Sequence, residues 1–500
     1  MDVRTTVGWL ALAFGLASCG DDGGGSASAT GTSGATAATN GSTSAASGSS
    51  GSAGSSSGSG GGGETSGTSG GGSTSGGATT GSSSGSSGGD TTSGGTSTGG
   101  DTTTSTGGST GVDSGTTTGG GEPSDEDLLR MAIEGELDPG DVMRQIADGG
   151  GFPVKTEAGT FMFACLCGPG TWALVGDHNQ WAPDVMMKAG ALWWTEVEIA
   201  DPDGSLYKFH DTIDAYIPDP MGRRYGYDNF GEFSLVRASA PHLERWYGLE
   251  GYGLEPRDVQ VYVPQDAAFT HVVYAHDGQN LFDPDGIWGG WKLQESVPPE
   301  MLVVGVDNTP ARMDEYTHTT DKIGGQTLGG KGSDYAKLVH EELRPRMEAA
   351  YGAPLRVGLM GSSLGGLISL YIADQYASEY DMTMSLSGTA GWGSIGAGLK
   401  NPTIRELYEM AGKRDFAIYL DHGGDDGGMA CVDSDMDGTM DDNDLASDNY
   451  CENLQLRDSL LDLGYTSEVD LWHYWEPGAP HNEAAWAARV GIPLGLFADL

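Results

Sequence analysis

Residues 361–365 read Gly-Ser-Ser-Leu-Gly, which is a G-x-S-x-G pattern centred on Ser363. The pattern lies between the apolar segment 355–360 and the segment 367–377, whose composition is typical of a helix. Glycines on both sides of a serine permit a sharp turn between a strand and a helix, which presents the hydroxyl above the sheet. The backbone N–H of Leu364 would then face the position at which an oxyanion develops. The spacing therefore predicts that Ser363 is a nucleophile.

A serine nucleophile needs a general base, and three histidines follow Ser363 in the chain. His422 directly precedes the glycines of an acidic loop, and His473 lies inside a strand-like run, where we expect a structural role. His481 lies in a loop that contains proline and glycine, ahead of a helix-like segment near the C-terminus. We therefore expect His481 to be the general base.

A carboxylate normally orients the imidazole of such a base and stabilises its protonated form. The strand-like segment 416–420 is followed by the loop 421–426, which contains three aspartates. By chemistry alone, Asp421, Asp425 or Asp426 could take this role. The order serine, acid, histidine along the chain is the one expected when the nucleophile stands on a strand-to-helix turn.

Strands and helices alternate from about residue 242, which is typical of a parallel sheet covered by helices. Strands are expected over 259–263, 271–275, 301–306 and 355–360, and a helix over 335–351. The preceding segment has short apolar runs broken by Gly, Pro and Asp, which predict strands of a small β-sandwich over 161–163, 172–175, 193–197 and 207–209. On residues 174–181, 207–209 and 219–220, this segment resembles the early-set sandwich that precedes the catalytic domain of enterochelin esterases and glycogen-active enzymes. Trp193 and Trp194 could stack on a sugar or pack inside, and at least one should face the core.

From about residue 257 to the C-terminus, the chain resembles the Putative esterase family of α/β-hydrolases. That family includes enterochelin esterases, feruloyl and acetyl-xylan esterases, S-formylglutathione hydrolases and mycolyltransferases. The matching residues are 274–283, 305–308, Arg312, 315–316, the G-x-S-x-G pattern, His481, Glu483 and Trp486. The resemblance implies the α/β-hydrolase fold and selects Asp426 over Asp425 as the acid of the triad. It also implies that the backbone N–H of Gln279 is the second oxyanion donor, and the less favoured alternative is that residues 277–280 form a simple turn at the end of a strand.

The resemblance implies a serine esterase that cleaves carboxylic esters through an acyl-enzyme and needs no catalytic cofactor. We expect ester substrates outside the cell, with polysaccharide-linked esters first and siderophore lactones second. An acyltransferase of the same fold is one alternative. A non-catalytic glycan-binding lipoprotein at the cell surface is an alternative of another class.

An acidic segment departs from the family between the predicted acid and the base. Residues 433–444 have the spacing of a twelve-position calcium loop. The candidate ligands are Asp433, Asp435, Asp437, the Thr439 carbonyl, Asp441 and Asp444. The spacing predicts a structural Ca²⁺, and the alternative is an acidic turn exposed to solvent. Cys431 and Cys451 flank this segment and are the expected disulfide, whereas the pairing of Cys165 and Cys167 stays open.

The N-terminus predicts export. Residues 7–16 form an apolar run that suits a signal peptide, and residues 16–20 read Leu-Ala-Ser-Cys-Gly, which resembles a bacterial lipobox. We therefore expect cleavage before Cys19, a lipid on its thiol, and a lipoprotein that is anchored to a membrane. The net charge of −45 argues against a nucleic-acid partner.

The chain contains 85 glycines. Many of them lie in residues 20–121, a segment of almost pure Gly, Ser and Thr, and this composition predicts a disordered linker. The predicted organisation is a signal peptide over 1–19, a disordered linker over 20–121, a short helical segment over 122–150, an early-set β-sandwich over 151–240, and an α/β-hydrolase esterase domain over 241–500.

Overall fold

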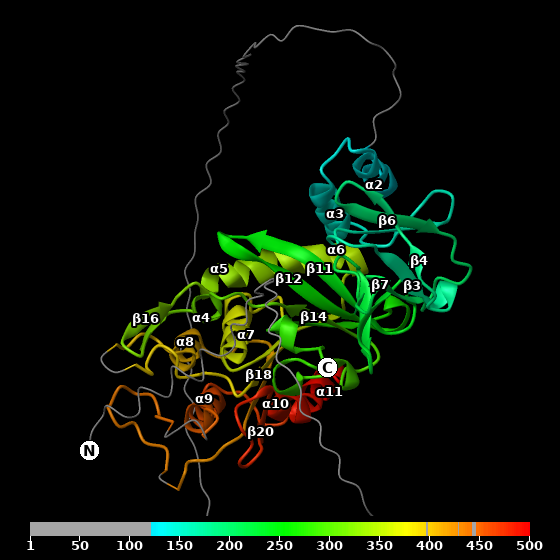
Figure 1. The fold of residues 1–500 in the computed structure, drawn as a ribbon. Coiled ribbons are helices and arrows are strands. Elements are labelled where there is room, and N and C mark those ends of the chain that lie inside the picture. The colour runs from blue at the N-terminus through cyan, green and yellow to red at the C-terminus, as the bar shows by residue number, and fades with distance from the viewer. Residues whose placement is uncertain (1–121, 397–398, 429, 443–446) are drawn as a thin grey trace, which may run out of the picture. The chain divides into compact units, whose positions relative to one another are not determined.

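The computed structural model describes residues 122–396, 399–428, 430–442 and 447–500 (Figure 1). The predicted signal peptide, Cys19, the predicted linker and Asp444 lie outside these residues. Two helices, α2 (Asp125–Glu134) and α3 (Pro139–Asp148), occupy the segment expected to be helical. Ser124 caps α2 and Asp138 caps α3, because each side chain accepts backbone N–H groups of the first turn. Among the described residues, no helix has the length and apolar character needed to cross a membrane.

A four-stranded sheet follows, in the order β1-β2-β6-β5. Its strands are β1 (Val154–Lys155), β2 (Phe161–Cys165), β5 (Met187–Ala189) and β6 (Leu192–Val197). Alternate side chains of β2 point to opposite faces: Met162 packs with the residues of α2 and α3, and Phe163 packs with those of β3 (Ala173–Gly176) and β7 (Leu206–His210). Trp193 belongs to this second core cluster and donates its indole N–H to the Gly168 carbonyl, which supports packing as its role.

The second sheet has fourteen strands, and its main path runs β20-β19-β18-β17-β13-β14-β12-β11-β9-β10-β7-β3-β4, with β8 paired to β7. Its further strands are β4 (Asp184–Val185), β8 (Tyr216–Ile217), β9 (Arg224–Asp228), β10 (Gly231–Leu235), β11 (His242–Gly251), β12 (Leu254–Val263), β13 (His271–His276), β14 (Met301–Val306), β17 (Arg356–Ser362), β18 (Met382–Leu386), β19 (Ala417–His422) and β20 (Leu471–Trp475). The strands β13, β14, β17, β18, β19 and β20 are parallel, and β12 is antiparallel to β14. Their carboxyl ends therefore meet at one edge, as the predicted α/β-hydrolase fold requires.

Strands from the segment expected to form a separate sandwich extend this second sheet. The link is the pairing of β9 with β11, at Tyr225 with Leu243 and at Arg224 with Glu244. The strands β10, β7, β3 and β4 continue beyond β9. The assignment of this segment to the early-set sandwich stays a prediction.

Helices cover both faces of the parallel strands (Figure 1). One face packs against α5 (Gly332–Lys337), the π-helical turn η6 (Leu338–Leu343), α6 (Arg344–Tyr351), α7 (Leu364–Gln375), α8 (Ile404–Ala411) and α9 (Tyr450–Asp462). The other face packs against α10 (Glu483–Arg489) and α11 (Gly491–Ala498). The helix α4 (Arg312–Glu315) and the hairpin β15 (Thr320–Ile323) and β16 (Gln326–Gly329) follow β14. Short 3₁₀ turns are η1 (Asp177–Asn179), η2 (Gln265–Ala267), η3 (Gly278–Asn280), η4 (Ile287–Gly289) and η5 (Leu293–Glu295).

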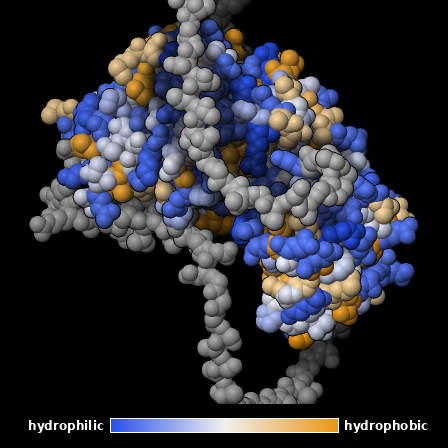
Figure 2. Space-filling model, turned by 90° about the horizontal axis from the view of Figure 1, so that it is seen from above, coloured by the Kyte–Doolittle hydropathy of each residue, from blue (hydrophilic) through white to orange (hydrophobic). Residues whose placement is uncertain are grey.

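One face of the outer surface is largely hydrophilic (Figure 2), and the four cysteines of the described residues form two disulfides. Figure 2 shows a face on which hydrophilic residues dominate and hydrophobic residues form small, separate patches. The structure joins Cys431 to Cys451, which is the pair expected around the acidic segment. It also joins Cys165 to Cys167, the pair that the sequence left open.

Candidate active site

Ser363 stands on the turn between β17 and α7. Its backbone has φ 56° and ψ −124°, a conformation that non-glycine residues rarely adopt. A Cβ added to Gly361 would lie 2.5 Å from the carbonyl carbon of Gly365, and one added to Gly366 would lie 2.4 Å from Ser385 Oγ. The turn is therefore possible only because these positions lack side chains, and the strained serine is the one that the G-x-S-x-G pattern selects.

Leu364 is the first residue of α7, so its N–H has no acceptor within the helix. The side of α7 at this end lies against the end of β13, because a Cβ on Gly365 would lie 3.3 Å from His276 Cβ and 3.4 Å from Asp277 Oδ2. The turn after β13 and the start of α7 are thus neighbours, which is what two oxyanion donors from these segments require.

The turn after β13 carries Gln279 and is held from several sides. Asp277 has φ 62°, and its carboxylate accepts two bonds from Arg312, at 2.7 and 2.8 Å, and one from Asn308 Nδ2 at 2.6 Å. Its N–H donates to the Tyr316 hydroxyl at 3.1 Å. Burial alone would raise the pKa of Asp277, but the charge of Arg312 and these hydrogen bonds lower it. Arg312, Asn308 and Tyr316 therefore fix the turn that carries Gln279, and the oxyanion role of the Gln279 N–H stays a prediction.

His481 lies in the loop before α10, whose N-cap is Asn482. Its Nδ1 is 2.5 Å from Asp448 Oδ1, and its ring meets the ring of Trp486 edge-on with centroids 5.0 Å apart. The imidazole is partly exposed, at 27% of its side-chain area, whereas the Asp448 side chain is fully buried. The structure therefore supplies the partner of the predicted base, and it is Asp448.

The carboxylate of Asp448 is enclosed by donors. Oδ2 accepts the Ser387 hydroxyl at 2.7 Å and the Gly423 N–H, and Arg489 Nη2 lies 3.5 Å away. Burial acts to raise the pKa of Asp448, but the bond from His481, the bond from Ser387 and the charge of Arg489 outweigh it and lower the pKa. Asp448 is therefore ionised at neutral pH and can hold the proton of His481 on Nδ1.

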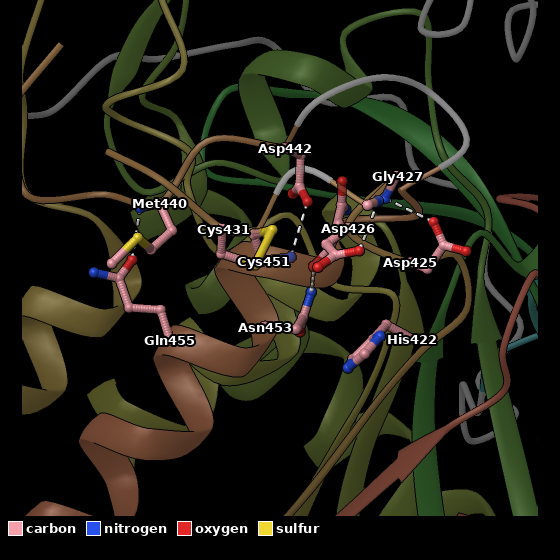
Figure 3. The surroundings of a disulfide bond; sticks show 12 residues. His422, Asp425, Asp426, Gly427, Cys431, Met440, Asp442, Cys451, Asn453 and Gln455 are labelled. Carbon is pink, nitrogen blue, oxygen red and sulfur yellow. Dashed lines mark hydrogen bonds between the residues drawn. A yellow bond between two sulfur atoms is a disulfide. The ribbon is translucent and has the colours of Figure 1, made fainter. Parts of the chain in front are cut away.

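The placement of Asp448 corrects the expectation for Asp426. Asp426 lies in the loop after β19, where its Oδ1 accepts the Gly428 N–H at 2.8 Å. Figure 3 shows Asp425 and Asp426 on this loop, near the Cys431–Cys451 bond. The chain makes a long excursion after Gly424 and returns to the sheet edge at the start of α9. Asp448 lies just before α9, and the Cys431–Cys451 disulfide and the bond from the Cys451 N–H to Asp442 Oδ1, at 2.9 Å, join the acidic segment to the start of that helix (Figure 3).

The sequence leaves Asp448 as a possible acid but does not select it. Asp448 directly precedes the residues that start α9 and stands outside the calcium-loop spacing, so it had no other assigned role. Nothing local marks it as the partner of His481, because the contact joins residues 33 positions apart.

The remaining histidines after Ser363 contact each other, with His422 buried and His473 half-buried. His422 Nε2 lies 2.9 Å from His473 Nε2, and His422 Nδ1 lies 3.1 Å from the Gly423 carbonyl oxygen. Burial lowers the pKa of His422 to about 4 and that of His473 to about 3. Both rings are neutral at neutral pH, which agrees with the structural role expected for His473.

The acidic segment brings part of its predicted ligand set together. One carboxylate oxygen each from Asp433, Asp435 and Asp437 lie within 4.8 Å of one another. The oxygens of Asp433 accept the N–H groups of Asp437 and Gly438, at 3.0 and 2.9 Å, which curls the loop around them. Asp441 Oδ2 accepts the Ser434 N–H at 2.8 Å. Such hard oxygen donors fit Ca²⁺ in chemical type.

Comparison with known proteins relates the catalytic segment to a family. Residues 254–489 match the family model described as Putative esterase. Uncharacterized protein YbbA of Bacillus subtilis (strain 168) is 29% identical over 132 residues, which cover 25% of this chain and 52% of that protein. The match thus spans about half the length of that relative.

Three solved structures are similar at low identity. The enterobactin esterase FES from Shigella flexneri has a TM-score of 0.36 and 15% identity, over 68% of this chain and 93% of that one. The IroE-like serine hydrolase from Shewanella oneidensis has a TM-score of 0.39 and 19% identity, over 51% and 80%. The siderophore hydrolase EstA from Aspergillus nidulans has a TM-score of 0.38 and 17% identity, over 51% and 94%. By this match and the residues that carry it, residues 254–489 of this chain are similar to the Putative esterase family.

Proposed function

We propose that this protein hydrolyses carboxylic esters, with Ser363 as nucleophile, His481 as general base and Asp448 as the acid that orients it. The observation that carries the proposal is the 2.5 Å contact between His481 Nδ1 and the buried Asp448 carboxylate, in a chain whose Ser363 stands on a strained turn. The match to an esterase family supports the reaction class.

The reaction starts when His481 Nε2 accepts the proton of Ser363 and the serine oxygen attacks the ester carbonyl. The N–H groups of Leu364 and Gln279 stabilise the negative oxygen of the tetrahedral intermediate. His481 then gives the proton to the leaving alcohol, which leaves an acyl group on Ser363. Water, deprotonated by His481, attacks this acyl-enzyme and releases the carboxylic acid and the free serine. Throughout, Asp448 keeps the Nδ1 proton in place and balances the charge of the imidazolium.

The substrate class that we propose first is esters linked to polysaccharides, with siderophore lactones second. The net charge of −45 supports this order, because a strongly acidic protein repels anionic ligands. Transfer of the acyl group to an alcohol in place of water uses the same residues. Analysis of products in the presence of a sugar acceptor separates hydrolysis from transfer.

The test of the reaction class is Ser363→Ala, assayed on p-nitrophenyl acetate. We expect a loss of about 10⁴-fold in kcat/KM or more, with an unchanged melting temperature to within a few degrees. Ser362→Ala is the matched control, because it removes a neighbouring buried hydroxyl. Activity of Ser363→Ala within tenfold of the wild type would exclude this nucleophile.

We further propose that residues 433–444 bind a structural Ca²⁺. The cluster of Asp433, Asp435 and Asp437 supports this, since three carboxylates so close together repel one another without a cation. Asp437, Thr439 and Asp441 belong to the same proposed ligand set as Asp444. The triad needs no metal, so the ion would act on stability.

We also propose that the protein is exported and anchored through a lipid on Cys19. The support is the sequence of residues 1–20 alone. Mass spectrometry of the native N-terminal peptide decides the matter. A diacylated Cys19 at the N-terminus is expected, and a free thiol or another cleavage position would contradict it.

A further inference from the structure

Ser387 follows β18 directly and is fully buried. Its backbone has φ 48°, the left-handed region, which a non-glycine residue adopts only when its surroundings hold it there. Its N–H donates to the Asp421 carbonyl at 2.8 Å, and its carbonyl accepts Asn449 Nδ2 at 2.8 Å. The residue is therefore fixed on both sides of its side chain.

The hydroxyl of Ser387 has three partners. It lies 2.7 Å from Asp448 Oδ2, 2.9 Å from Trp486 Nε1 and 2.6 Å from Arg489 Nη2. A hydroxyl has one proton to donate and two lone pairs to accept with. The indole and the guanidinium can only donate, so they take both lone pairs, and the single proton must go to Asp448.

The same turn also contacts the nucleophile. The Ser363 N–H donates to the Leu386 carbonyl at 2.9 Å, and the Thr389 N–H donates to the Ser363 carbonyl at 3.1 Å. Asn453 Nδ2, from the first turn of α9, donates to the Gly388 carbonyl at 2.7 Å. Residues 386–389 therefore hold the backbone of the nucleophile and the start of the helix that follows the acid.

We propose that Ser387 is a positioning residue for the catalytic acid: its hydroxyl fixes the rotation of the Asp448 carboxylate, so that Oδ1 faces His481, and stabilises its ionised form. The inference rests on the proposed esterase function. It assigns to Ser387 an effect on the proton affinity of the Asp448–His481 pair, which a buried serine with a purely structural role would not have.

The hydroxyl should lower the proton affinity of the pair, because a donor to a carboxylate favours its charged form. The Asp448 carboxylate faces His481, the Ser387 hydroxyl, the Gly423 N–H and Arg489. Arg489 also forms an ion pair with Asp421, with Nε 3.0 Å from Oδ1. Loss of the Ser387 donor leaves the other groups in place. The pair then binds a proton more tightly, and the acid limb of the pH–rate profile moves to higher pH.

The test compares Ser387→Gly with Ser385→Ala on p-nitrophenyl acetate. Glycine removes the hydroxyl and suits the left-handed backbone. Ser385 is a matched control, because it is fully buried near the end of β18, two residues before Ser387, and its hydroxyl has no hydrogen-bond partner in the part of the chain that the structure describes. For Ser387→Gly we expect kcat to fall about 10- to 100-fold, the range for loss of one hydrogen bond to a charge, with KM within about twofold. The acid limb of kcat/KM should rise by about half a pH unit or more.

Several outcomes would overturn the inference. A folded Ser387→Gly with the kcat and acid limb of the wild type removes the assigned role. A fall in kcat with no shift of the acid limb shows a structural role only. If neither Ser387→Gly nor Ser387→Ala folds while Ser385→Ala does, the hydroxyl is structural and the inference is likewise wrong. A wild-type rate that survives Ser363→Ala refutes the proposed function instead, so the two failures are distinct.

Discussion

Asp448→Asn tests the assignment of the acid. The substitution keeps the shape of the side chain and removes its charge. In the wild type, Asp448 Oδ1 accepts the Nδ1 proton of His481 at 2.5 Å, and the carboxylate is fully buried. An amide can instead present an N–H to Nδ1, which moves the imidazole proton to Nε2. His481 then has no lone pair for the proton of Ser363.

The expected loss is large because the wrong tautomer cannot act as a base. Substitution of the acid by its amide in a serine triad costs about 10⁴-fold in kcat. That factor equals about 5.4 kcal/mol of transition-state stabilisation at 1.36 kcal/mol per factor of ten. The melting temperature should change much less than the rate, since the carbonyl oxygen of the introduced amide can still accept from Ser387 and the Gly423 N–H.

Asp426→Asn is the matched control for this prediction. Asp426 is half-buried in the loop after β19 and accepts the Gly428 N–H, and the partner of His481 Nδ1 is Asp448, so substitution of Asp426 should change kcat/KM by no more than about threefold. Both variants are assayed on p-nitrophenyl acetate between pH 5 and pH 9. The reasoning is refuted if Asp426→Asn loses a thousandfold or more, and Asp448→Asn stays within tenfold of the wild type.

Two further predictions concern stability. Chelation with EGTA should lower the melting temperature by several degrees, because a cation held at a hundredfold excess over Kd stabilises the native state by about 2.7 kcal/mol, and it should reduce activity only as the protein unfolds. An unchanged melting temperature would leave residues 433–444 as an acidic turn, and immediate loss of activity without loss of stability would make the metal catalytic. Burial raises the pKa of Asp307 to about 7, so its contribution to stability is full below about pH 4 and falls as the pH rises towards 7. Asp307→Asn should therefore raise the melting temperature at pH 8 more than at pH 5. An equal change in melting temperature at both pH values would contradict the raised pKa of Asp307.

The local parts of the site could be predicted from the sequence. The turn at Ser363 follows from glycines at fixed positions between an apolar strand and a helix, and every residue it needs lies within a few positions. His481 could be selected for a similar reason, since the proline and glycine around it predict a loop. The fold class follows from the alternation of strands and helices, which is also a local pattern.

The acid could not be predicted, because its position depends on how a long segment folds back. Asp426 is close to β19 in sequence, but the contact with His481 is made by Asp448 after the excursion closed by Cys431 and Cys451. The pairing of β9 with β11 was missed for a related reason. The choice of partner along a strand edge depends on tertiary packing, and residue patterns within each strand do not encode it.

The most direct test of the account is covalent labelling of the wild-type protein with a fluorophosphonate, followed by mass spectrometry of its peptides. The reagent phosphonylates a serine only when a base activates it, so the label reports the nucleophile and the working triad together. The account predicts one modified residue, Ser363, and strong loss of labelling in Ser363→Ala and Asp448→Asn. A label on another residue, or a folded wild-type protein that takes no label, would contradict it.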